Sequence, residues 1–145
     1  MRYNCNYNCE RMSNYKRGKH SIFSLNYHLI LVVKYRRRVL NCKMRNRIEE
    51  LASHMGLRHG VTVIDIEGEP DHLHLLLEAR PSTLIVKFIC SLKSASSRIL
   101  KKEFPSIRNA LWTEAFWSRS YFLTSAGGAP LSILKNYVAH QGGFG

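Results

Sequence analysis

Two histidines one residue apart, His72 and His74, are the side chains whose types and spacing could most clearly do chemistry. They begin an apolar run, residues 72–79, that is typical of a β-strand. Because strand side chains alternate between faces, both imidazoles should project from one side of the strand. Neutral imidazole is a common ligand of divalent metals, so the pair could form part of a metal site. The alternative is that both are ordinary surface or core histidines, and the pair alone does not decide.

A second candidate pair lies near the end of the chain. Tyr137 and Gln141 are four residues apart in a stretch expected to be helical, so they should share one helical face. There Tyr137 could act as a nucleophile and Gln141 could give an oxygen ligand to a metal. His140 could be the ligand instead of Gln141, although it projects about 100° away from it around the helix. The alternative is that Tyr137 packs its ring and Gln141 is solvated.

The charge of the chain indicates its partner. The 145 residues contain 22 Lys and Arg against 10 Asp and Glu, a formal net charge of +12. Such a surplus favours a polyanion through phosphate neutralisation and counterion release. Aromatic residues interleave with the charges, as in residues 34–38 (KYRRR), which favours nucleic acid over a merely soluble basic protein or one that touches anionic lipid.

The composition also disfavours several classes of protein. The sequence contains no run of about 18 apolar residues, so it predicts no membrane span. Residues 1–18 do not have the apolar core of a secretory signal. We therefore expect a cytoplasmic protein with reduced thiols. Cys5 and Cys9 with His20 would be a weak zinc pattern. The two aspartates, Asp65 and Asp71, are too few to favour a carboxylate-triad nuclease.

The order of the strands and helices expected to position these residues predicts an α+β domain. Residues 1–18 are expected to be a flexible basic tail, and 19–145 a single domain. The expected strands span 21–33, 61–66, 72–79 and 116–124, with a turn at 67–71. The expected helices begin after a cap at Asn41 and end at Gly56, span 81–103 before Pro105, and span 130–141. This order predicts an antiparallel sheet with helices on one face, ferredoxin-like or RRM-like, plus a C-terminal helix carrying the tyrosine.

Two expected helices carry apolar stripes that should face the sheet. The first consists of Met44, Ile48, Leu51, Ala52 and Met55, and the second of Leu84, Phe88, Leu92, Ala95 and Ile99.

A series of short motifs runs from His20 to Gln141. In sequence order they are YH at 27–28, KYRRRVL at 34–40, PDHLHLL at 70–76, KSASSR at 93–98, LW at 111–112, FW at 116–117, YF at 121–122, GG at 127–128 and YVAHQ at 137–141. Taken together, these motifs resemble the single-tyrosine HUH transposases of the smallest bacterial insertion sequences.

The resemblance implies a chemistry. Mg²⁺ or Mn²⁺ would be held by His72, His74 and Gln141 and would act as a Lewis acid on a scissile phosphate. Tyr137 would attack single-stranded DNA, which leaves a 5′-phosphotyrosine link and a free 3′-OH for strand transfer.

The resemblance also implies partners and an assembly. The chain would bind DNA hairpins at element ends and would form a homodimer whose active sites combine one subunit's histidines with the other's tyrosine helix. Gly127 and Gly128 would be the hinge. Candidate contacts to the hairpin backbone are Lys34, Arg36, Arg37, Arg38, Lys93 and Arg98, each of which could instead be a solvated charge.

Two other functions are compatible with the same residues. One is a domesticated, REP-associated relative that acts on chromosomal repeats. The other is a non-catalytic nucleic-acid-binding module whose aromatic residues, such as Phe23 and Tyr27, stack on bases. A relaxase or replication initiator is disfavoured, because residues 75–79 contain no third histidine.

Overall fold

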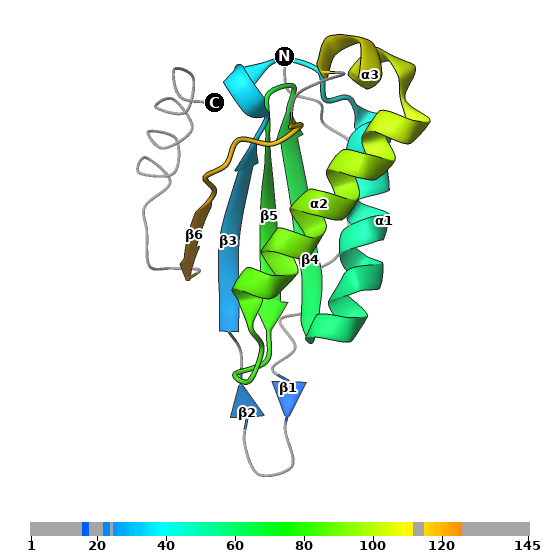
Figure 1. Ribbon diagram of the computed structural model, residues 1–145. Helices are drawn as coiled ribbons and strands as arrows, with labels where there is room; N and C mark the ends of the chain where they lie inside the picture. Colours follow the sequence, from blue (N-terminus) through cyan, green and yellow to red (C-terminus); the bar gives the residue numbers. More distant parts are fainter. Residues whose placement is uncertain (1–15, 18–21, 24, 112–114, 126–145) are drawn as a thin grey trace.

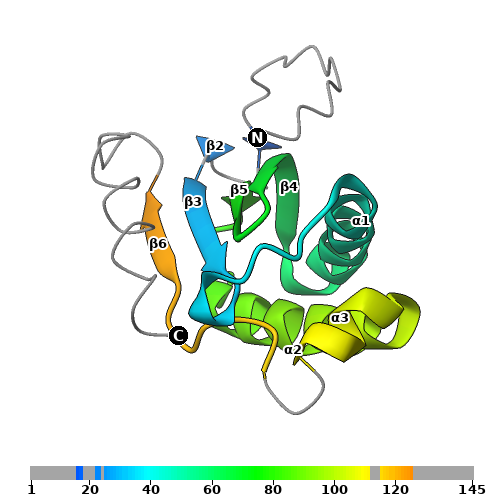
Figure 2. The same cartoon turned by 90° about the horizontal axis from the view of Figure 1, so that it is seen from above.

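The computed structural model describes residues 16–17, 22–23, 25–111 and 115–125. Its main sheet is antiparallel, with strand order β4-β5-β3-β6. The strands are β3 (Leu25–Val32), β4 (Val61–Glu69), β5 (His72–Ala79) and β6 (Phe122–Ser125). Helices α1 (Cys42–His59) and α2 (Ile85–Glu103) lie on one side of this sheet (Figures 1 and 2). The predicted ferredoxin-like α+β fold is confirmed.

The alternation of side chains along β5 explains which face the helices cover. Leu73, Leu75 and Leu77 are fully buried, whereas His72 and His74 between them are only half-buried. The leucines pack in the core with residues of both helices, such as Ile48 and Phe88. The histidines therefore lie on the face of the sheet opposite α1 and α2.

Helix α1 begins where the sequence predicts and ends later. The side chain of Asn41 accepts a hydrogen bond from the Met44 N–H at 2.9 Å, which confirms the N-terminal cap. The predicted end at Gly56 is wrong, because the helix continues to His59 and stops at Gly60, whose φ is 72°. Gly56 is needed for a different reason: a Cβ there would lie 2.1 Å from the Val61 carbonyl oxygen.

Helix α2 begins four residues later than expected and buries a rotated stripe. Residues 81–84 precede it in a turn in which the Thr83 N–H donates to the Arg80 carbonyl. The helix ends at Glu103, as predicted. The predicted stripe is wrong at Leu84, which is 63% exposed, and its members Ala95 and Ile99 are only half-buried. The buried residues of the helix are instead Phe88, Ile89, Leu92, Ser96 and Leu100.

Three further boundaries differ from expectation. The strand predicted over 21–33 is observed as β3, Leu25–Val32, while Ile22–Phe23 pairs in a separate two-stranded sheet. Strand β4 continues to Glu69, so the predicted turn at 67–71 shrinks to Pro70 and Asp71, and Glu69 pairs with His72. Pro105 ends α2 but also begins a short helix, α3 (Pro105–Leu111), because proline is favoured in a first helical turn.

The predicted strand at 116–124 is shorter in the structure. Only Phe122–Ser125 pairs as a strand, and Trp117 forms an isolated bridge with Val33. The side chains of Phe116 and Trp117 are buried and pack edge to face, 4.6 Å apart. Core packing therefore fixes this segment without regular strand pairing.

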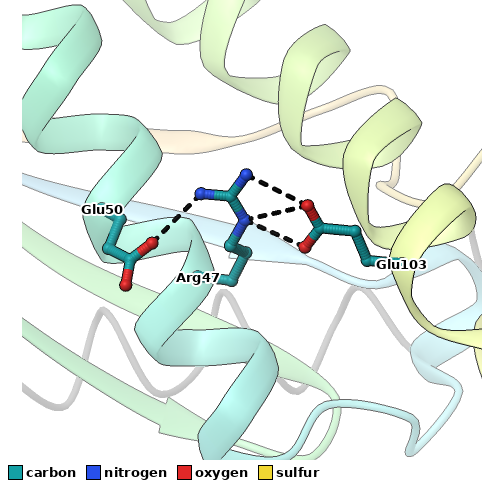
Figure 3. A network of polar contacts seen from close by, with 3 residues as sticks. All are labelled: Arg47, Glu50 and Glu103. Carbon is teal, nitrogen blue, oxygen red and sulfur yellow. Dashed lines mark hydrogen bonds and ion pairs between the residues drawn. The ribbon is translucent and has the colours of Figure 1, made fainter.

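Smaller features complete the description. A two-stranded sheet pairs β1 (Lys16–Arg17) with β2 (Ile22–Phe23), and the short helix η1 (Lys34–Arg36) follows β3. Arg47 of α1 binds Glu103 at the end of α2 and Glu50 on its own helix (Figure 3). Within the described part of the chain, no helix is long and apolar enough to cross a membrane.

Candidate functional site

The predicted histidine pair shares one face of a central strand. On β5, His72 lies opposite Val32 of β3 and Glu69 of β4, and His74 lies opposite Ile30 and Glu67. Both imidazoles thus stand on a strand that is paired on its two sides, which limits how far their backbone can move. This geometry matches the sequence prediction that His72 and His74 project together.

His72 is held by a buried carboxylate. Its Nδ1 atom lies 2.8 Å from Oδ1 of Asp71, and Oδ2 of Asp71 accepts a hydrogen bond from Nε of Arg36 at 2.9 Å. Asp71 is only 4% exposed. Burial acts to raise the pKa of Asp71, but the hydrogen bonds from His72 and Arg36 outweigh it and hold the pKa below its usual value. Asp71 is therefore a carboxylate that bridges an imidazole and a guanidinium.

Arg36 reaches Asp71 from an unusual backbone turn. Tyr35 and Arg36 both have positive φ, 59° and 51°, a conformation that residues with a side chain rarely adopt. The flanking backbone is tied to the β4–β5 turn: the Val33 N–H donates to the Asp71 carbonyl and the Leu40 N–H to the Pro70 carbonyl, both at 2.9 Å. Figure 1 shows η1 beside the end of the sheet where this turn lies.

His74 has a different partner. Its Nε2 atom lies 2.7 Å from Nδ1 of His28 on β3, with the two ring centroids 4.9 Å apart. Burial lowers the pKa of His74 below its usual value and the nearby His28 acts in the same direction, against the opposite effect of Glu67 and Asp65. His74 is therefore neutral near pH 7, which is the form that binds metals.

Some of the residues predicted to complete a metal site lie outside the part of the chain that the structure describes. Among residues 25–111 and 115–125, no group of three or more His, Cys, Asp or Glu side chains is placed to hold a metal ion. Tyr137, Gln141, Gly127, Gly128 and the alternative ligand His140 lie outside the described residues, as do residues 1–15 of the predicted tail. The structure brings together His72 and His74, and it adds Asp71, Arg36 and His28 around them.

The predicted DNA-contacting residues fall into two groups. Arg38 and Arg98 are exposed. The others have protein contacts: Arg36 binds Asp71, Arg37 donates to the Ala110 carbonyl, and Lys34 and Arg37 lie 5.5 and 5.6 Å from the centre of the Tyr35 ring. All stay predictions as DNA contacts.

Lys93 of the same set is held by backbone carbonyls. Its ammonium donates to the carbonyls of Ser118 and Arg119 at 2.8 and 2.9 Å, and burial lowers its pKa. One turn along α2, Ser96 accepts a hydrogen bond from the buried Trp117 indole at 2.8 Å. Lys93 and Ser96 thus fasten the segment before β6 onto α2, a role that the sequence prediction did not include.

Sequence reasoning assigned neither Asp71 nor His28 to this site, and it named Arg36 only as a candidate DNA contact. Asp71 directly precedes His72, and a carboxylate next to a candidate ligand histidine was the available signal. His28 lies on the same side of β3 as Ile30 and Val32, but its contact with His74 depends on the strand register. The contact of Arg36 depends on a strained turn that no pattern in the sequence indicates.

The chain is similar to known transposases in sequence and in fold. Residues 21–141 match the family model described as "Transposase IS200 like". The ISDra2 transposase TnpA of Deinococcus radiodurans is 32% identical over 126 residues, which cover 87% of this chain and 90% of the relative. A crystal structure assigned to a transposase from D. radiodurans has a TM-score of 0.76 at 29% identity, covering 87% of this chain and 97% of that one.

A second solved structure shares the fold alone. It is a REP-associated tyrosine transposase bound to a REP hairpin, with a TM-score of 0.53 and 12% identity. The match covers 88% of this chain and 68% of that one.

Proposed function

This chain belongs to the IS200-like transposase family and is a DNA transposase, and on that premise we propose that it cuts and rejoins single-stranded DNA at a divalent-metal site built around His72 and His74. The observation that carries the proposal is the placement of two imidazoles on one face of β5, with His72 held through Nδ1 by the Asp71 carboxylate. A carboxylate or carbonyl on the second ring nitrogen is usual for histidines that bind metals.

The donor set suits Mg²⁺ or Mn²⁺ bound with open positions. His72 and His74 would supply nitrogen ligands and Gln141 an amide oxygen, which leaves room for phosphate oxygens. When bound, such a cation supplies Lewis-acid polarisation of the scissile phosphate. The neutral state of His74 near pH 7 supports this assignment, since a protonated imidazole has no lone pair to donate.

Tyr137 would be the nucleophile. Its phenolic oxygen would form a bond to the phosphorus while the bond from phosphorus to the 3′ oxygen breaks, and the leaving oxygen would take up a proton. The products are a 5′-phosphotyrosine link and a free 3′-OH. Because the covalent link conserves the phosphodiester bond energy, the 3′-OH of another strand can reverse the reaction and complete transfer without ATP.

The proposed DNA partner is a hairpin at the element end. The net charge of +12 supports binding to a polyanion, and a protein of the same fold is solved with a hairpin bound. Exposed Arg38 and Arg98 are the best-placed candidates for phosphate contacts. We also propose a homodimer in which the Tyr137 helix of one subunit completes the His72/His74 site of its partner, with Gly127 and Gly128 as the hinge.

The test is adduct trapping. A labelled single-stranded hairpin should become covalently attached to the protein with Mg²⁺ or Mn²⁺ and not with EDTA, and duplex DNA of the same sequence should not. Tyr137→Phe should abolish attachment while hairpin binding remains, and Tyr121→Phe is the matched control that should keep it. A non-catalytic binding module would bind the hairpin without metal and form no adduct. A REP-associated enzyme would form the adduct only with repeat-type hairpins.

A further inference from the structure

We propose that Asp71 and Arg36 are positioning residues for His72: the Asp71 carboxylate holds the Nδ1–H of His72 so that Nε2 is left to the metal ion, and Arg36 holds the carboxylate in place. The inference rests on the proposed function, because it assumes that His72 is a metal ligand. It extends that function by assigning roles to two residues outside the ligand set.

The proton assignment follows from the contact itself. A carboxylate oxygen can only accept a hydrogen bond, so the nitrogen that lies 2.8 Å from Oδ1 of Asp71 must carry the proton. In a neutral imidazole the other nitrogen, Nε2, then has the lone pair. Asp71 therefore selects the tautomer of His72 that can bind a metal through the nitrogen farther from the backbone.

Arg36 explains how the carboxylate keeps its orientation. Asp71 is adjacent to His72 in the sequence, and its side chain is 5% exposed, so bulk water cannot satisfy its second oxygen. The Arg36 Nε–H fills that place at 2.9 Å and supplies a compensating positive charge. The carboxylate is thus held from both sides, between the imidazole and the guanidinium.

The backbone of η1 supports the same assignment. Two consecutive residues with a side chain, Tyr35 and Arg36, adopt positive φ, and such residues persist only where their surroundings fix them. The surroundings are the hydrogen bonds from Val33 and Leu40 to the β4–β5 turn and from Lys34 to the Phe116 carbonyl. This strained turn delivers the guanidinium of Arg36 to the carboxylate that precedes His72.

Direct metal binding provides the first test. Mn²⁺ affinity of the full chain, without DNA, is measured by calorimetry and by electron paramagnetic resonance for Asp71→Asn, Arg36→Gln, His72→Ala and the native sequence. Carboxylates that hydrogen-bond the second ring nitrogen of a metal-binding histidine usually contribute about 10- to 100-fold in metal affinity, so we expect losses of that size for Asp71→Asn and smaller ones for Arg36→Gln.

A matched control removes a carboxylate–arginine pair elsewhere. Glu103→Gln removes the negative charge from the ion pair of Glu103 with Arg47, which joins α1 and α2 on the other side of the sheet (Figure 3). It should leave Mn²⁺ affinity unchanged. Thermal unfolding followed by circular dichroism confirms that each variant is folded.

A second readout does not depend on metal or on activity. In the metal-free protein, ¹⁵N NMR of the histidine rings reports which nitrogen is protonated. We expect His72 to carry its proton on Nδ1 in the native chain and to populate both tautomers in Asp71→Asn. A purely structural role for Asp71 would leave the tautomer ratio unchanged. Should a variant fail to fold, Arg36→Gln and the native spectrum still test the assignment.

The outcomes separate two failures. If His72→Ala loses Mn²⁺ while Asp71→Asn and Arg36→Gln bind it as tightly as the native chain, the positioning role is overturned and the proposed metal site stands. If His72→Ala binds Mn²⁺ like the native chain, the metal site itself is wrong, and the positioning role falls with it.

Discussion

The Nδ1 atom of His28 lies 2.7 Å from the Nε2 atom of His74, across the boundary between β3 and β5. Of the two ring nitrogens of His74, Nε2 is the one farther from the backbone and so reaches farther out from the sheet. In the structure that nitrogen is engaged by another imidazole. A metal ion that binds through Nε2 of His74 must therefore take the place of His28.

Because a metal ion at Nε2 of His74 has to displace His28, His28→Phe should tighten metal binding. Phenylalanine keeps an aromatic ring beside His74 but cannot form the hydrogen bond. Because a typical hydrogen bond contributes about 0.5–1.5 kcal/mol net, Mn²⁺ affinity should rise about 2- to 10-fold in calorimetry. Weaker binding in this variant would show instead that the metal uses Nδ1 and that His28 orients the ring.

Ser96→Ala should destabilise the protein through Trp117. The serine accepts the indole N–H at 2.8 Å in a buried site and donates to the Leu92 carbonyl, so alanine leaves the Trp117 donor without its partner. We expect a loss of about 1–3 kcal/mol in the free energy of unfolding, measured with urea. In a double-mutant cycle, Trp117→Phe should remove most of the effect of Ser96→Ala, because no indole donor then remains. Additive losses would refute the coupling.

Gly56→Ala should be destabilising although alanine favours helices. A Cβ at this position would meet the Val61 carbonyl oxygen at 2.1 Å, so α1 and β4 would have to separate. Overpacking of this kind costs about 1–3 kcal/mol in the free energy of unfolding. Ser53→Ala at an exposed position of the same helix is the control and should change stability by less than about 0.5 kcal/mol. Equal effects of the two substitutions would mean that the close approach does not constrain the fold.

The exposed and the engaged basic residues should behave differently in DNA binding. Arg38→Gln should weaken hairpin binding for all sequences and should reduce the slope of log affinity against log salt by about 1. Lys93→Gln should instead lower the unfolding temperature, because it removes the contacts to the Ser118 and Arg119 carbonyls. Lys102→Gln, an exposed charge at the end of α2, is the control for a general charge effect. A change in slope for Lys93→Gln without loss of stability would reverse the assignment.

The sequence was sufficient to predict the boundaries of elements with clear periodicity or a clear cap. Strand β5 begins and ends where its alternating pattern predicts, and Asn41 caps α1 as expected, because these signals are local. The predicted buried face of α2 differs from the observed one, because several apolar residues form competing helical faces. Only packing against the sheet selects among them. The end of α1 was missed because Gly56 serves a close contact with β4, which no local signal reveals.

The same difference between local signals and non-local contacts applies to the candidate site. The shared face of His72 and His74 follows from strand alternation. Their surroundings do not, because His28 is 46 positions from His74 and Arg36 is 35 positions from Asp71, so both contacts depend on strand register or on a strained turn. Non-local contacts of this kind are set by the whole fold, so local patterns in the sequence do not reveal them. The role of Lys93 was missed for the same reason, since its acceptors lie 25 and 26 residues along the chain.

We propose that the phenol of Tyr137 attacks DNA phosphorus at a metal site formed by His72 and His74. The most direct test of this proposal is peptide mapping of the covalent adduct by mass spectrometry, after reaction with a single-stranded hairpin substrate and Mg²⁺. We expect a nucleotide linked through its 5′ phosphate to Tyr137, a free 3′-OH on the released strand, and no adduct in His72→Ala or His74→Ala. An adduct on another residue, or one that forms equally well in either histidine variant, would contradict the proposal.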